Sequence, residues 1–304
     1  GPTSSISDDR LKGNKFDYMI TNPPFGVSWK NEKRFVDDES TDPNGRFSVG
    51  TPRTSDGSLL FLQHLIHKMN PEGSRIGIVF NGSPLFSGDA GSGESEIRKF
   101  IIENDWLECI VQLPDQMFFN TGITTYFWII TNKKSEERKG KVQLINGSSF
   151  YKEMKKSLGS KRKEISEKQS TELFNIYKGF EENENCKIYP NNFFGYTKVV
   201  IERPLLINGD KVSNKNGKFK PDSSKRDFEK VPMSMDINDY FANEVKPYLK
   251  DAWMDRAKDK VGYEINFTQY FYKFLKLRDP EIILDEIHKL DKEISDISKE
   301  LGTK

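Results

Sequence analysis

The chain has 304 residues, with 47 Lys and Arg against 46 Asp and Glu and a formal net charge of +1. This length excludes a small disulfide-stapled peptide, and the 12% aromatic content excludes a disordered tail. Because the net charge is near zero, contact with nucleic acid requires a local basic cluster or a partner. Two isolated cysteines and no apolar run near the ~20 residues of a membrane span lead us to expect a reduced, cytoplasmic protein.

The first half of the chain alternates strand and helix patterns. Apolar runs predict strands at residues 16–20, 75–80, 107–113 and 124–131, with an added edge strand at 142–145. Helical spacing predicts one helix from the N-cap Asp56 to Met69 and another over about 94–104. This alternation is typical of an α/β fold with a mostly parallel sheet and crossover helices.

The composition changes after Ser149, and we expect three regions. Residues 1–150 form the α/β part, 151–230 form a basic and linker-rich region with a short strand, and 231–304 form a helical assembly region. In the middle region, residues 152–163 carry six basic side chains and one acidic one. This stretch is either a solvated face or a patch that contacts phosphates, and the sequence does not separate the two interpretations.

The last part of the chain predicts two helices. The first has one apolar face, made of Ile237, Tyr240, Phe241, Val245 and Tyr248. The second has apolar residues that alternate spacings of four and three, at Ile283, Ile287, Leu290, Ile294, Ile297 and Leu301. Such a seam requires a facing helix, either from this chain or from a partner. We favour a partner, because the seam lies at the end of the chain behind a charged stretch.

The most specific local motif is Asn22-Pro23-Pro24-Phe25, which directly follows the first predicted strand. Open α/β sheets bind ligands at the carboxyl ends of their strands. The Asn22 side-chain oxygen and a proline carbonyl can each accept one hydrogen of an exocyclic amine, which frees the nitrogen lone pair to attack a methyl group. Phe25 offers a flat surface for a base that has left the helix stack. This chemistry requires no metal.

Longer segments resemble the methylation (M) subunit of type I restriction–modification systems. The Asn-Pro-Pro-Phe tetrapeptide looks like the catalytic motif of the amino methyltransferases. The remaining segments occur in a consistent order over nearly the whole chain. The matching segments are residues 16–26, 56–64, 81–86, 88–98, 113–122, 196–205 and 262–268.

The resemblance implies the fold and the activity. It implies a partial Rossmann-like methyltransferase sheet, with residues 1–150 as the C-terminal half of the catalytic domain. It also implies transfer of a methyl group from S-adenosylmethionine to N6 of a flipped adenine in duplex DNA. Catalysis would fall to Asn22, Pro23, Pro24 and Phe25, with Asn22 also bordering the cofactor and Phe119 joining Phe25 in base stacking.

The resemblance further implies a complex with a specificity (S) subunit, a second M subunit and, for restriction, an R subunit. Members of the family carry an N-terminal helical domain and a glycine-bearing cofactor loop upstream of the Asn-Pro-Pro strand, and neither lies in this sequence. The chain also opens with Gly1 and reaches its first strand by Phe16. We therefore expect a fragment that binds the cofactor weakly or not at all and is inactive alone.

Other motifs have structural interpretations. The glycines of 88–95 do not match a dinucleotide-binding spacing, so we expect a mobile turn and a helix cap there. His64 and His67 lack a completing carboxylate or thiol and are assigned to packing or surface roles.

Two alternatives to the DNA activity are methylation of a protein glutamine amide and, for this fragment alone, a non-catalytic assembly module.

Overall fold

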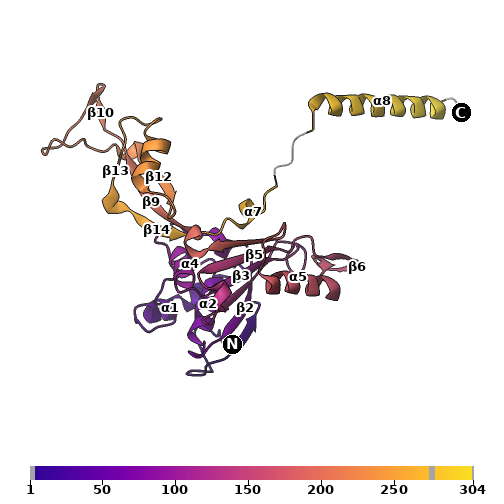
Figure 1. Cartoon of the computed structure of the whole chain (residues 1–304), viewed down its shortest axis with the longest axis horizontal. Helices are drawn as coiled ribbons and strands as arrows, with labels where there is room; N and C mark the ends of the chain where they lie inside the picture. Colours follow the sequence, from indigo (N-terminus) through magenta and orange to yellow (C-terminus); the bar gives the residue numbers. More distant parts are fainter. Residues whose placement is uncertain (1–3, 274–277, 303–304) are drawn as a thin grey trace. The chain divides into compact units, whose positions relative to one another are not determined.

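The computed structural model describes residues 4–273 and 278–302. The contacts divide the chain into two units, with the boundary between Tyr270 and Phe271. The first unit contains the β-sheets, and the second contains one long helix, α8 (Pro280–Gly302) (Figure 1). Over the described ranges, no helix combines the length and the apolar character that a membrane span needs.

A six-stranded sheet forms the core of the first unit. Its strands lie in the order β1-β2-β4-β3-β5-β8. They are β1 (Tyr18–Thr21), β2 (Arg75–Phe80), β3 (Leu107–Gln112), β4 (Tyr126–Thr131), β5 (Lys141–Asn146) and β8 (Cys186–Pro190). The later strands of a Rossmann-like methyltransferase sheet are thus present, as the sequence predicts.

The prediction of a mostly parallel sheet is wrong. Only β1–β2 and β3–β5 are parallel, whereas β4 runs antiparallel to β2 and β3, and β8 runs antiparallel to β5. The reason is the connection between β3 and β4, which contains no helix and so cannot return the chain for a parallel pairing. The strand predicted at 142–145 is not an edge strand, because β8 pairs with its outer side.

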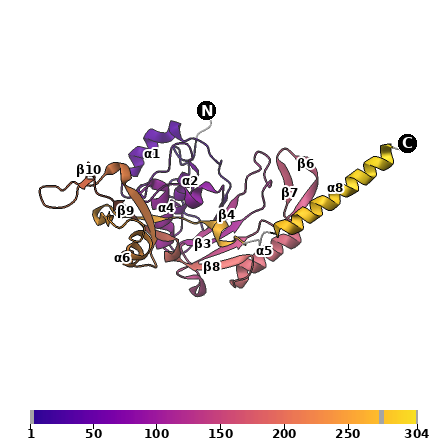
Figure 2. The ribbon, with the colours of Figure 1, turned by 90° about the horizontal axis from the view of Figure 1, so that it is seen from above.

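Helices cover the two faces of this sheet (Figure 2). On one face lie α2 (Ser58–His67) and α4 (Gly93–Glu103), which contact each other. The N-cap of α2 is Gly57 and not the predicted Asp56, whose carboxylate accepts a hydrogen bond from the Ser58 backbone N–H at 3.1 Å just before the helix. On the other face α5 (Glu167–Gly179) packs on the Cys109 and Val111 side of β3.

A second sheet is built around β9 (Gly195–Glu202), which pairs antiparallel with β12 (Asp227–Pro232), β13 (Trp253–Met254) and β14 (Lys260–Tyr263). Two hairpins complete the strands. They are β6 (Lys152–Leu158) with β7 (Lys161–Glu164), and β10 (Leu206–Ile207) with β11 (Asp210–Lys211).

The remaining helical segments are short. They are α1 (Lys33–Ser40), α3 (Ser83–Phe86), α6 (Ile237–Tyr240), α7 (Phe267–Tyr270), a π-helical turn at Phe241–Val245, and single 3-10 turns at Lys30–Glu32, Glu136–Arg138, Asn191–Phe194, Ser223–Lys225 and Arg256–Lys258.

Two expectations for residues after 150 need correction. The basic stretch is a β-hairpin, and the linker-like 208–230 contains β11 and the start of β12. β12 has few apolar residues because β9 supplies its hydrogen bonds and Val231 alone of its side chains is buried. The predicted apolar face of 237–248 does join the core of the second sheet, except that Tyr248 is exposed.

Arg98 of α4 joins the second sheet to the first. Its side chain is fully buried and donates hydrogen bonds to the carbonyls of Tyr263 at 2.6 Å, Pro84 at 3.1 Å and Gly88 at 3.4 Å. Burial lowers the pKa of the Arg98 guanidinium to about 10, so the group stays charged at neutral pH. The charge is therefore stabilised by carbonyl dipoles from three separate segments.

Replacing Arg98 with methionine should destabilise the fold by about 2–4 kcal/mol, because buried carbonyls lose their donor. Urea unfolding of the purified chain measures this change. The exposed Arg34 provides the control, since Arg34→Met should shift the unfolding free energy by less than about 0.5 kcal/mol. An Arg98→Met midpoint equal to that of the unaltered protein would show that the contact contributes nothing.

Candidate active site

The segment from Asn22 to Phe25 leaves the sheet at the carboxyl end of β1. Pairing with β2 ends at Thr21 opposite Ile78, where the two prolines follow and offer no backbone N–H. Asn22 and Pro24 are exposed, Pro23 is buried and Phe25 is half-buried. Gly26 has φ +61°, a conformation that glycine adopts readily, and turns the chain away from the sheet.

These residues form one wall of a cavity of about 730 Å³. This volume lies within the range of small-molecule pockets. Another wall comes from the loop between β3 and β4, and Asn81, directly after β2, also lines the cavity. The cavity residues outside the motif are Gly26, Val27, Asn81, Phe118, Phe119, Asn120, Thr121 and Ile123. The space beside the motif is therefore open, as the predicted chemistry requires.

The aromatic residues of the two walls have different environments. The Phe25 and Phe118 rings pack edge to face, with centroids 6.2 Å apart and planes at 89°. Phe119 is 58% exposed, and its ring lies 5.6 Å from the Lys161 Nζ. The family resemblance implies that Phe119 joins Phe25 in base stacking. In the structure, Phe118 is the ring that contacts Phe25, and Phe119 lines the same cavity from a more exposed position.

The cavity contains no ionisable side chain among its lining residues. The Asn22 side chain has no hydrogen-bond partner among the described residues, and none of them donates to the Pro23 carbonyl. Two neutral acceptors are thus available on the cavity wall. Asn81 was not predicted. Its sequence signals were its place after an apolar strand and in the family-like segment 81–86. Its side-chain oxygen accepts a 3.0 Å hydrogen bond from the Ser83 N–H.

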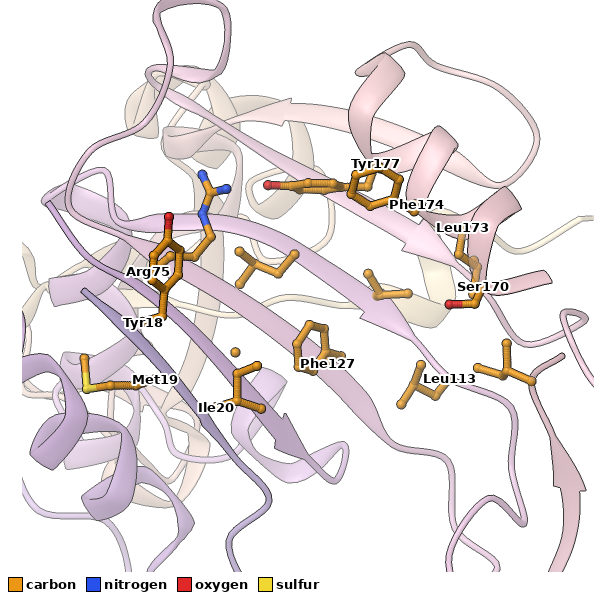
Figure 3. A pocket seen from close by; sticks show the side chains of 14 residues that line it. Tyr18, Met19, Ile20, Arg75, Leu113, Phe127, Ser170, Leu173, Phe174 and Tyr177 are labelled. Atoms are coloured by element: carbon orange, nitrogen blue, oxygen red, sulfur yellow. The ribbon is translucent and has the colours of Figure 1, made fainter. Parts of the chain in front are cut away.

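A second cavity, of about 450 Å³, lies on the face of the sheet that α5 covers only in part (Figure 3). Side chains of β1 and α5 border it from opposite sides, with Phe127 between them. Beside it, the Glu108 carboxylate accepts hydrogen bonds from Arg75 and from the Tyr177 hydroxyl. Burial and the Glu108 charge raise the pKa of Tyr177 above its ordinary value.

The outer edge of β1 adjoins this second cavity. Tyr18 is 80% exposed and Ile20 is 84% exposed, although both are large apolar residues of a sheet strand. β1 pairs with β2 on one side and with no described strand on the other. An unpaired apolar strand edge is a site where another segment can add.

The described residues do not form a complete pocket for S-adenosylmethionine. The second cavity is lined almost entirely by apolar side chains, with Arg75 as its one charged residue. The amino-acid carboxylate, ribose hydroxyls and sulfonium of the cofactor need polar partners that this lining lacks. The lining of this cavity therefore does not fit the polar groups of the cofactor.

Other candidate residues lie away from the cavity. The Ser92 hydroxyl accepts a hydrogen bond from the Ser95 N–H at 3.4 Å, which confirms the predicted helix cap. His64 Nδ1 lies 2.9 Å from the Arg46 guanidinium, and burial with this positive neighbour lowers the pKa of His64. No group of three or more potential ligands for a metal ion occurs within the described part of the chain.

Comparison with known families identifies the chain. The pattern of the family described as N-6 DNA Methylase matches residues 3–201. The chain therefore belongs to the N-6 DNA methylase family. The family that the comparison supports is one described for DNA, and the match does not point to methylation of a protein glutamine amide.

Individual relatives agree with the family. The chain is 31% identical over 207 residues to the type I restriction enzyme MjaIX methylase subunit of Methanocaldococcus jannaschii, covering 67% of this chain and 35% of that protein. It is 36% identical over 133 residues to the HindI methylase subunit of Haemophilus influenzae, covering 43% and 27%. The chain thus spans about a third of the length of these relatives.

A solved structure shows the same fold. It is the methyltransferase subunit of a type I restriction–modification system from Streptococcus thermophilus, with a TM-score of 0.52 and 23% identity. The match covers 62% of this chain and 37% of that one.

Proposed function

We propose that this chain is the target-base half of a type I restriction–modification methylation subunit, which transfers a methyl group from S-adenosylmethionine to N6 of a flipped adenine. The observation that carries the proposal is the open, uncharged cavity at the end of β1. Its wall offers the uncommitted Asn22 side chain and Pro23 carbonyl, with Phe25 beside them. The duplex and the specificity subunit would contact the chain outside this cavity.

Asn22 and Pro23 act on the two hydrogens of the adenine amine. Each N–H donates to one of the two acceptors. The nitrogen lone pair is then less delocalised into the adenine ring and points at the methyl donor. Phe25 stacks on the flipped ring, and Phe118 supports Phe25 edge-on. S-adenosylmethionine, when bound, supplies the electrophilic methyl group. Because no lining side chain can take a proton, the nitrogen releases its surplus proton to water after transfer.

The cofactor half of the enzyme would dock on the exposed edge of β1. The relatives contain about two thirds of their length outside the matched segment. A parallel strand added beside Tyr18 and Ile20 would pair the free edge, and a helix following it would fill the apolar second cavity. This arrangement places the cofactor loop at the same strand ends as Asn22.

The Asn22→Ala variant of the full-length protein should lose about 100-fold or more of its methyl-transfer rate, because one of two amine acceptors is removed. Transfer of labelled methyl groups to DNA measures the rate, and gel filtration with the specificity subunit checks assembly. Asn192→Ala, at an exposed position outside the cavity, is the matched control and should keep full activity. Substantial methylation by Asn22→Ala would contradict the amine-acceptor mechanism.

The upstream region should slow hydrogen exchange at β1. Exchange measured on this chain and on the chain extended upstream should differ at the amides of Tyr18–Thr21, while those of β8 exchange alike in both. Calorimetry should detect S-adenosylmethionine binding to the extended protein only. Equal exchange at β1, together with equal cofactor affinity, would exclude this edge as the docking site.

The apolar seam of α8 should bind a helix of the specificity subunit. Its six residues are 39–73% exposed, and the opposite side of the helix is charged. Deletion of residues 279–304, or the single change Ile294→Asp, should abolish co-purification of that subunit. Lys292→Asp, on the opposite side of α8, should leave it intact. Retention of the partner by the deletion variant would remove α8 from the interface.

A further inference from the structure

The hairpin β6–β7 is bonded to the loop that forms the far wall of the target-base cavity. The Ser160 N–H donates to the Phe119 carbonyl at 3.0 Å, and the Arg162 N–H donates to the Gln116 carbonyl at 3.0 Å. The Lys163 ammonium forms an ion pair with Asp115 at 2.6 Å. An isolated two-stranded hairpin is marginally stable in water, so these bonds determine where this one lies.

The hairpin is strongly positive. Residues 152–164 carry six Lys or Arg and two Glu, a net charge of +4, whereas the whole chain carries +1. The remaining residues therefore carry a net charge of −3, which is +1 minus +4. A polyanion would be attracted to this hairpin and repelled by the average of the rest.

Only part of this charge is neutralised within the protein. Lys152 pairs with Glu164 at 3.0 Å, and Lys163 pairs with Asp115. The exposed Lys155, Lys156 and Arg162 form no ion pair with any described residue. Three cations in one small hairpin repel one another, and this arrangement is stabilised when an anionic partner lies against it.

We infer that the hairpin β6–β7 binds the phosphodiester backbone of duplex DNA beside the flipped nucleotide. The inference rests on the proposed function. The flipped base would enter the cavity beside the wall to which the hairpin is bonded. Lys161, with its Nζ 5.6 Å from the Phe119 ring, links the basic surface to the exposed cavity wall. The duplex is preferred over other polyanions because a stacking cavity and phosphate-binding cations occur together.

The chemistry assigns separate tasks to the two features. Lysine and arginine contacts to phosphates supply affinity and register without reading the base sequence. The cavity then receives the base that the backbone contacts bring to its entrance. The hairpin should therefore affect how tightly DNA binds and how salt weakens binding, while the rate at saturating DNA depends on the cavity.

The test compares two triple variants in the full methyltransferase complex with its specificity subunit. Lys155→Gln/Lys156→Gln/Arg162→Gln removes the unpaired cations of the hairpin. Lys215→Gln/Lys218→Gln/Lys220→Gln removes the same charge from an exposed loop of the second sheet. Fluorescence anisotropy with a duplex that carries the recognition site, over a range of salt concentrations, gives the dissociation constant and its salt dependence.

The hairpin variant should bind DNA about 10- to 1,000-fold more weakly, with a salt slope smaller by about 2–3. Its methylation rate at saturating DNA should stay within about twofold of the unaltered complex, and the loop variant should match that complex throughout. The separate variant Lys155→Arg/Lys156→Arg keeps the positive charge and should bind DNA as tightly as the unaltered complex. This comparison separates an effect of charge from an effect of misfolding.

Two results would overturn the inference: an unchanged salt slope in the hairpin variant, or equal losses in both triple variants. A loss of methylation rate at saturating DNA with normal binding would also do so, because the hairpin would then serve the cavity alone. Failure of the proposed function is distinguishable. In that case the unaltered complex would bind DNA through the hairpin and transfer no methyl group to adenine.

Discussion

The missing N–H groups of two consecutive prolines determine what the end of β1 can do. A sheet strand normally continues its ladder until its donors and acceptors are used. Pro23 and Pro24 stop the ladder after Thr21, and neither the Asn22 side chain nor the Pro23 carbonyl has a hydrogen-bond partner among the described residues. Because φ is fixed in proline, these acceptors stay in place without a bound ligand. A neutral site that recognises an amine by its hydrogens follows from this one feature.

The face and the edge of the sheet around β1 both leave apolar surface uncovered by the described residues. α5 packs against β3 and β5, and Glu108 of β3 accepts hydrogen bonds from Tyr177 of α5 and from Arg75 of β2. Beyond that contact the apolar face stays open up to Ile20. A sheet is stabilised when both of its apolar faces are buried and its edge strands are paired or covered. Here the open apolar face and the unpaired edge of β1 lie next to each other. Both fit the docking of a further strand and helix that we propose for this edge.

Charge is arranged around the cavity and not inside it. The lining is neutral, so the flipped base meets hydrogen-bond acceptors and aromatic rings. The unpaired cations lie on a hairpin bonded to the far wall. In the proposed function, this separation would let phosphate contacts hold the duplex without placing a competing charge next to the reacting amine. The hairpin would then give a chain with a net charge of +1 a local surface for DNA.

The local sequence was enough to find the strands that carry apolar runs, the helix cap at Ser92 and the Asn-Pro-Pro-Phe motif that lines the cavity, because each depends on neighbouring residues. The helix α5 also had a local signal, because Ser166 and Gln169 form a capping box. It was not predicted, because the segment follows a lysine-rich stretch that was interpreted as a basic region. Four features could not be predicted from the local sequence. They are the antiparallel β4, the polar strand β12, the contact of Phe25 with Phe118, and the attachment of the basic hairpin to the cavity wall. Each of these joins residues far apart in the chain, so its energy comes from pairing and packing that no local pattern records.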